Sequence, residues 1–296
     1  MASMLGGIWS GRVCSALALS AAATLLGGCV GLGWEPANFK ATRTLNVAHV
    51  AGKAVDVETG NGAISVVRGS TSEVTIVANL KATTQERLDA TVVSADRDPD
   101  GTLVVRVLWP EQRKGSEGCS FEITVPDAVG VRVDTSNGGV TLAGLAGEAV
   151  LETSNGAVKV RDHNGSVHAD TSNGAIELVE VGGPVFADTS NGAVTVVLRM
   201  DAAGPVNVSS SNGAIDVTLS PVFGGTLDAD TSNGSVSFSS LPGSARASTS
   251  KGRARIEFAR SAAASTTDVE NGSAQGGNSR LDTSNGSITI KTRSGV

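Results

Sequence analysis

The sequence predicts an all-β protein, a single-domain parallel β-solenoid of about 18–21 residues per coil with an irregular β cap at its N-terminal end. Three observations support this. The pentapeptide DTSNG begins at Asp134, Asp170, Asp188, Asp230 and Asp282, with looser copies between them. Most copies follow one another after 18 or 21 residues, and short alternating apolar runs flank each copy. Such a period is typical of stacked units that bury apolar surface against their neighbours.

Residues 1–28 carry one charge, Arg12, followed by a run of apolar and small residues that is too short and Gly-rich for a membrane span. We interpret them as an export signal. The signal ends in LGGC at Cys29, which resembles the lipobox of bacterial lipoproteins, where the cysteine is lipidated after cleavage. The alternative is an ordinary secretory peptide with an incidental cysteine. Val30 follows the cysteine, and by resemblance to lipoprotein sorting this favours the outer membrane in a bacterium with two membranes.

Residues 29–43 then form a short tether, and 44–130 form the N-terminal β cap with the first irregular coils. The cap contains strand-like runs and a corner at Asn61-Gly62. The stretch ATTQERLDA is a candidate short helix, and PEQRKGSEG is a predicted loop. Solenoids need atypical ends because exposed sheet edges pair with other chains.

Residues 131–292 form the regular repeats, and 293–296 form a tail. Two strands flank each Asn, and their alternation separates inward from outward positions. Predicted inward positions lie four residues before the Asn and three and five residues after it, as in Leu151, Val158 and Val160 around Asn155. The positions between them are polar and predicted to face solvent. Between Gly252 and Asp282 the repeat period is interrupted, which indicates either one irregular coil or an insertion.

Asn-Gly between two alternating runs also fits a β-hairpin, so hairpins are a live alternative. The recurrence of identical residues favours a solenoid, in which each Asn amide hydrogen-bonds along the stack and each Gly supplies a positive φ. Lys251 replaces the Asn in one degenerate copy, and Gly147, Gly165, Gly183 and Gly225 mark the second corner. The predicted structural corners are Asn137, Gly138, Asn155, Gly156, Asn173, Gly174, Asn191, Gly192, Asn212, Gly213, Asn233, Gly234, Asn285 and Gly286.

The formal net charge of the chain is −6, and loss of the signal with Arg12 makes it more acidic still. This balance argues against nucleic acid as a partner, which requires a basic footprint. Of the three cysteines, Cys14 leaves with the signal and Cys29 carries lipid, so Cys119 remains alone. We expect Cys119 to pack as a small apolar side chain.

The acidic column Glu152, Asp170 and Asp188 is the main candidate for chemistry. We interpret it as a solvated ridge without metal, because calcium requires six to eight oxygens. The alternative function is a lyase or glycosidase that uses two carboxylates of this column. That enzyme would need one buried carboxylate and aromatic sugar platforms, whereas the chain has no Tyr and three of its six phenylalanines are expected at inward or corner-adjacent positions of the repeats. The histidines, His49, His163 and His168, are expected at the surface and not as metal ligands.

The lipobox, the phrase FEITVPDAVGVRVDTSNGGV and the following DTSNGAV coils together resemble a family of bacterial envelope proteins labelled "putative adhesins". The resemblance covers roughly residues 45–290 and implies a β-solenoid without an assigned activity. Because no catalytic constellation stands out in the sequence, we expect a binding or scaffold module of the envelope, not an enzyme, that needs no cofactor. The expected partners are the membrane, through lipid on Cys29, and an envelope polysaccharide or a surface protein.

Overall fold

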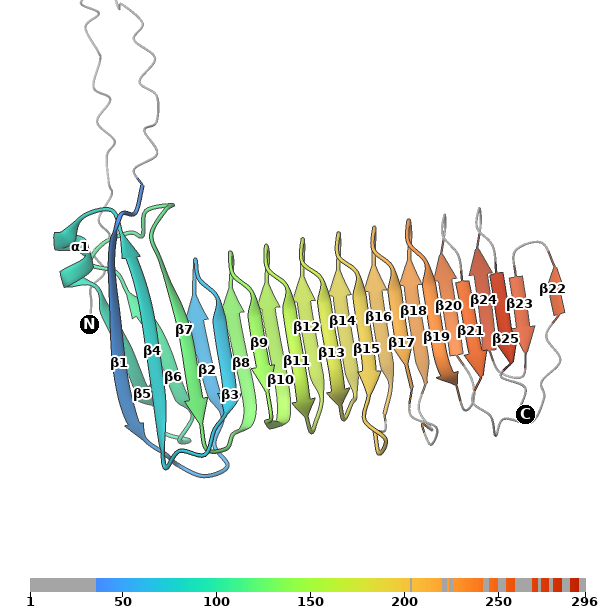
Figure 1. Cartoon of the computed structure of the whole chain (residues 1–296), viewed down its shortest axis with the longest axis horizontal. Coiled ribbons are helices and arrows are strands. Elements are labelled where there is room, and N and C mark those ends of the chain that lie inside the picture. Colours follow the sequence, from blue (N-terminus) through green and yellow to red (C-terminus); the bar gives the residue numbers. More distant parts are fainter. Residues whose placement is uncertain are drawn as a thin grey trace, which may run out of the picture. The chain divides into compact units, whose positions relative to one another are not determined.

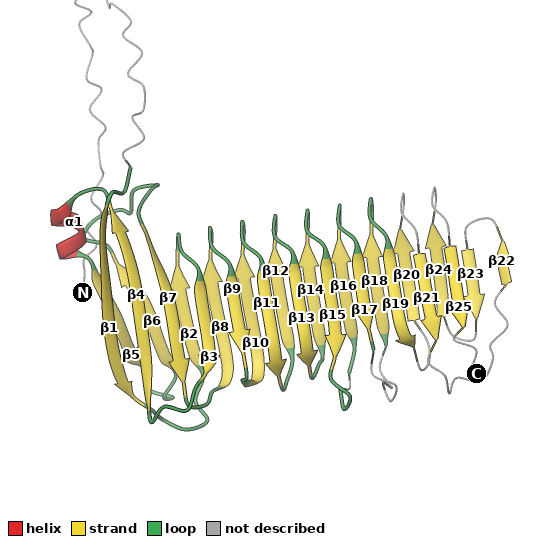
Figure 2. Cartoon of the chain, in the orientation of Figure 1, coloured by secondary structure: helices red, strands yellow, loops and turns green. Residues whose placement is uncertain are grey.

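A computed structural model describes residues 36–202, 204–219, 223 and 226–241, and the strands within 245–292 given below. Glu35–Val296 form one compact unit. Almost every regular element is a strand, and the one helix among the described residues is α1 (Gln85–Ala90) (Figure 2). No helix in the described part of the chain is long and apolar enough to span a bilayer. Cys29, Lys251, Gly225, Asn285 and Gly286 lie outside the described residues.

The strands form two sheets, A and B (Figure 1). In spatial order, sheet A contains β1 (Phe39–Ala48), β4 (Glu73–Ala82), β7 (Gly118–Val125), β3 (Ile64–Arg68), β9 (Val140–Ala143), β11 (Val158–His163), β13 (Ile176–Val181), β15 (Val194–Leu198), β17 (Ile215–Thr218), β19 (Val236–Leu241), β21 (Ala254–Phe258) and β25 (Ile288–Thr292). Sheet B contains β5 (Val92–Arg97), β6 (Leu103–Leu108), β2 (Val55–Thr59), β8 (Val129–Thr135), β10 (Ala146–Thr153), β12 (Val167–Thr171), β14 (Val185–Thr189), β16 (Val206–Ser210), β18 (Leu227–Thr231), β20 (Ala245–Thr249), β24 (Ser279–Thr283), β23 (Ser273–Gly276) and β22 (Asp268–Glu270).

Each regular coil contributes one strand to each sheet, and strands of successive coils pair in parallel. The register aligns equivalent residues, so Glu152 pairs with Asp170 and Asp170 with Asp188 in sheet B. In sheet A, Val158 pairs with Ile176 and Ile176 with Val194. The solenoid prediction is therefore confirmed, and the hairpin alternative is wrong for these repeats.

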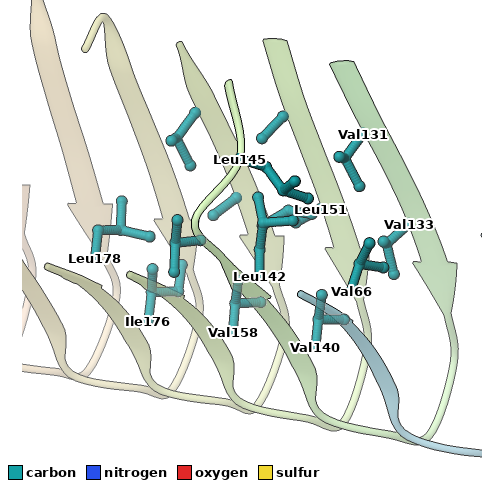
Figure 3. Close-up of a cluster of buried hydrophobic side chains, with 14 of the residues drawn as sticks. Val66, Val131, Val133, Val140, Leu142, Leu145, Leu151, Val158, Ile176 and Leu178 are labelled. Atoms are coloured by element: carbon teal, nitrogen blue, oxygen red, sulfur yellow. The ribbon is translucent and has the colours of Figure 1, made fainter. Parts of the chain in front are cut away.

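In the coils whose side chains the structure describes, as far as Phe238, the predicted inward columns are buried and belong to one core between the sheets, part of which is drawn in Figure 3. Leu151, Val158 and Val160 are each 0% exposed, and the equivalent side chains of the neighbouring coils are buried with them. The residues between them, such as Lys159, face solvent. The period-two alternation of the sequence therefore predicted the core residues correctly, because each sheet has one covered face and one open face.

In the cap, the order of the strands within the sheets differs from their order along the chain. The coil formed by β2 and β3 lies between the pair β6–β7 and the pair β8–β9, although β6 and β7 come later in the chain. β4 runs antiparallel to both β1 and β7, and β5 runs antiparallel to β6. Helix α1 confirms the expected short helix. Strand β1 begins at Phe39, inside the range 29–43 expected for the tether.

The irregular stretch near the other end contains an antiparallel extension of sheet B. Strand β22 pairs with β23, and β23 pairs with β24, both antiparallel. The parallel pairing resumes between β20 and β24, where Ser248 stands opposite Asp282. This stretch is therefore neither a regular coil nor a plain insertion, because its added strands continue the edge of the sheet.

Candidate functional site

The asparagines of the DTSNG corners form a hydrogen-bonded ladder along one edge of the stack. Each Nδ2 donates to the Oδ1 of the asparagine in the preceding coil, at 2.9 Å from Asn173 to Asn155 and 2.8 Å from Asn191 to Asn173. The same bond joins Asn137 to Asn61 at 2.6 Å, and the ladder continues through Asn155, Asn212 and Asn233. The predicted amide ladder is confirmed.

The reason for glycine at these corners differs from the expectation. None of the described DTSNG glycines from Gly138 to Gly234 has a positive φ. A Cβ atom added to Gly174 would lie 1.7 Å from the carbonyl oxygen of Gly156, and one added to Gly156 would lie 1.9 Å from that of Gly138. Glycine is required because the backbones of successive corners nearly touch. Positive φ instead characterises the second corner, with 88° at Gly147 and 74° at Gly183.

The threonine of each motif points inward and anchors one coil to the coil before it. Thr171 is 1% exposed, and its Oγ1 donates to the carbonyl oxygen of Gly156 at 3.0 Å. Thr153, Thr189 and Thr231 make the equivalent bond, and Ser210 replaces threonine in the same role. This hydrogen bond was not predicted from the sequence, although the parity of the threonine with the inward apolar column indicates burial. The Thr171 hydroxyl thus gives a hydrogen bond to a carbonyl that lies at the corner between strands β10 and β11.

The outward face of sheet B carries the most varied exposed chemistry. One column along it contains Asp134, Glu152, Asp170, Asp188, Ser209 and Asp230, and the next contains His168, Phe186, Asn207 and Asp228. The carboxylates of Asp170, Asp188 and Asp230 are exposed, as predicted for the acidic column. No group of three or more His, Cys, Asp or Glu side chains in the described residues is arranged to hold a metal ion.

Phe186 is an exposed aromatic side chain on this face. It is 39% exposed and stacks on His168 of the neighbouring strand, with ring centroids 6.2 Å apart and planes inclined by 29°. Phe186 was not identified from the sequence as an exposed aromatic side chain. Its position directly before the inward Ala187 is the signal that identifies it as outward.

A hollow of about 470 Å³ lies over strands β12 to β18 on the same face. It is lined by side chains from both outward columns: His168, Phe186, Asp170, Asp188, Asn207, Ser209, Asp228 and Asp230. Neither Lys nor Arg is found among the described side chains that line it. The face combines a ring, an amide and several carboxylates on backbone that parallel pairing holds in register, and we identify it as the candidate functional site.

The remaining candidate residues have structural roles. Cys119 is 0% exposed, and burial raises the pKa of its thiol to about 12, which fits the expected packing role and not a nucleophile. His163 is also 0% exposed, so the expectation of a surface histidine is wrong. Its Nε2 lies 2.9 Å from the carbonyl oxygen of Gly147. His49 is half-buried and lies 3.2 Å from Asp127.

Comparison with known proteins gives one family model and several solved structures. A model described as a domain of unknown function, DUF7330, matches residues 183–294. No curated protein matches the chain. A structure titled a putative adhesin from Bacteroides fragilis is 13% identical, covers 88% of this chain and 100% of its own, and has a TM-score of 0.41.

Two structures from Parabacteroides distasonis are also similar. One is titled a putative adhesin, with 12% identity, 86% of this chain and 97% of its own covered, and a TM-score of 0.39. The other is titled a putative lipid binding protein. It is 11% identical, covers 86% of this chain and 98% of its own, and has a TM-score of 0.35.

Proposed function

We propose that this chain is a non-catalytic binding or scaffold module of the cell envelope, an adhesin in the broad sense. The hollow on the outward face of sheet B carries this proposal. Ligand sites combine a concave surface, an exposed ring and a few polar groups on a rigid frame. The Asn ladder and the buried Thr hydroxyls supply that frame, because they fix each coil against the previous one.

The exposure of the carboxylates supports binding over catalysis. A glycosidase needs one carboxylic acid whose pKa is raised, and burial in an apolar pocket is the usual cause. Asp170, Asp188 and Asp230 are all exposed to solvent on an open sheet face. Such carboxylates suit hydrogen bonding and ion pairing with a ligand more than general acid catalysis.

A lipid anchor on Cys29 would attach the module to a membrane, the outer one where two are present. The motif LGGC and the position of Cys29 after an apolar run support this part of the proposal. Incorporation of a radiolabelled fatty acid tests it. We expect label in the wild-type protein and none in Cys29→Ser. Equal labelling of the two proteins, or none in either, would rule out an anchor at this residue.

A polysaccharide screen separates the binding module from an enzyme. The full chain carrying Cys29→Ser is incubated with purified envelope polysaccharides, and retention and chain length are both measured. Retention without shortening of the polymer supports the proposal. Shortening that disappears in a variant with Asp170→Asn and Asp188→Asn would identify a carbohydrate-active enzyme and reject it.

A further inference from the structure

The hollow contains a groove over strand β16. The outward side chains of β16 are Asn207 and Ser209, whereas β14 contributes Phe186 and Asp188 on one side. On the other side, β18 contributes Asp230 next to Ser209. The walls stand two strand spacings apart, or about 10 Å. The groove is therefore wide enough for one extended side chain or a flat group to enter between them.

One wall offers the face of an aromatic ring. His168 stacks against Phe186 from the strand β12 side, with ring centroids 6.2 Å apart. Phe186 lines the hollow and is 39% exposed, so part of its ring remains open to a ligand. A ring face carries negative electrostatic potential, and it attracts cations, guanidinium groups most often.

The charges of the groove are uncompensated among the described residues. Glu152 lies 3.8 Å from Arg132, and Glu177 forms an ion pair with Arg161. Among the described side chains, no such pair involves Asp188 or Asp230, and no basic one lines the hollow. Asp228 also lines the hollow, but it already has an interaction partner and stands opposite Arg246 in the strand register. We therefore do not count it among the carboxylates that bind the ligand. A cation in the groove would be attracted from both walls.

We propose that this groove binds an arginine side chain on an extended basic segment of a partner protein. A guanidinium is flat, stacks on a ring face and donates paired hydrogen bonds to a carboxylate. Phe186 provides the stacking surface, and Asp188 and Asp230 provide the acceptors. A neutral sugar would cover the two carboxylates without neutralising them. This inference rests on the proposed binding function and names its ligand.

Peptide binding to the full chain in a non-ionic detergent tests the inference. The probe is the capped peptide Ser-Arg-Ser-Arg-Ser-Arg, compared with its lysine and citrulline analogues by calorimetry at low salt. We expect the arginine peptide to bind more tightly than the lysine peptide and the citrulline peptide not to bind. The double variant Asp188→Asn, Asp230→Asn should weaken binding at least about tenfold. Phe186→Ala should weaken it about two- to fivefold.

Asp134→Asn is the matched control, because Asp134 lies in the same outward column but outside the groove. It should bind like the wild type. Unchanged affinity in the double variant, or equal binding of the citrulline peptide, would overturn the inference. If instead a polysaccharide binds through Asp188 and Asp230 and the arginine peptide does not, the groove is a sugar site and the proposed binding function survives. Cleavage of the polysaccharide would reject that function itself.

Discussion

The hydroxyl of Thr171 donates to the carbonyl oxygen of Gly156, the same oxygen that leaves no room for a side chain on Gly174. Two residues of one DTSNG motif therefore contact a single atom of the preceding coil. The hydrogen bond requires a short hydroxyl side chain, and the close approach requires glycine. The motif is conserved from coil to coil within this chain because each coil must fit the coil before it.

Gly174→Ala should destabilise the protein strongly. The added methyl group would lie 1.7 Å from the carbonyl oxygen of Gly156, so the two coils must separate. We expect a loss of about 1–3 kcal/mol or more in the free energy of unfolding, measured by denaturant titration. Gly139→Ala is the control, because its added methyl would meet the nearest atom at 3.4 Å. Equal effects of the two substitutions would contradict the close-approach explanation.

Val158→Asp should unfold the stack, whereas Lys159→Asp should leave it folded. Val158 is 0% exposed, and an unpaired carboxylate there costs several kcal/mol. Lys159 is exposed on the outer face of the same strand. Circular dichroism and thermal melting distinguish the two variants. Similar melting temperatures would mean that alternation does not define the core.

The ion pair between buried Glu117 and half-buried Arg87 should make stability fall in acid. Burial alone would raise the pKa of Glu117, but hydrogen bonds from Arg87, the Lys114 backbone N–H and Thr83 outweigh it and lower the pKa to about 2. Arg87 Nε lies 2.7 Å from Glu117 Oε1. Since the folded-state pKa lies below the usual 4.5, the stabilisation is present above pH 4.5 and is lost as pH falls toward about 2.

Glu117→Gln tests this pair. It should cost about 3–5 kcal/mol near neutral pH, because Arg87 then keeps a half-buried charge without its main partner. It should also flatten the acid dependence relative to wild type. Glu111→Gln should change stability by less than about 1 kcal/mol, since the Glu111 side chain is 82% exposed. A parallel pH dependence in wild type and Glu117→Gln would reject this role.

His163 should destabilise the fold when it is protonated. Burial lowers its pKa below 6.5, more than the hydrogen bond with the Gly147 carbonyl raises it. Within the described residues, its Nδ1 is the one buried side-chain nitrogen or oxygen without a hydrogen-bond partner. Below pH 6.5 the unfolded chain binds the proton more readily, so stability should fall as pH drops through this range.

Substitution of His163 by Leu should remove this pH dependence, whereas His168→Gln, at an exposed position, should retain it. Denaturant titrations between about pH 5 and pH 7.5 provide the measurement. A Leu variant with the wild-type pH dependence would show that another group titrates.

Removal of divalent metal should leave stability unchanged, because the carboxylates of the acidic column face solvent and are expected to hold no structural cation. A cation held by Asp170 and Asp188 would stabilise the fold by about 2.7 kcal/mol at a hundredfold excess over Kd. Melting curves with calcium and with excess chelator should therefore superpose at fixed ionic strength. A chelator-induced drop of more than about 3 °C would identify those carboxylates as ligands.

The regular coils could be predicted from the sequence because their contacts repeat at a fixed period. Alternation placed Leu151 and Val158 in the core, and the repeated Asn indicated the ladder. The same alternation placed Phe186 outside, but the prediction did not use it. In the cap, local sequence predicted strands and the short helix, but it carries no signal for which strands pair, as β2 does with β6 across distant parts of the chain. The burial of His163 likewise depends on contacts with other coils.

The Asn ladder also makes coils interchangeable. Every bond runs in the same direction, from the Nδ2 of a later coil to the Oδ1 of an earlier one, and Asn61 at its start donates to the carbonyls of Gly115 and Glu117 in the cap. A coil inserted between two others would find the same donor and acceptor on either side. Duplication or loss of whole 18- or 21-residue units is thus a low-cost route by which such a gene changes the distance between its groove and its cap.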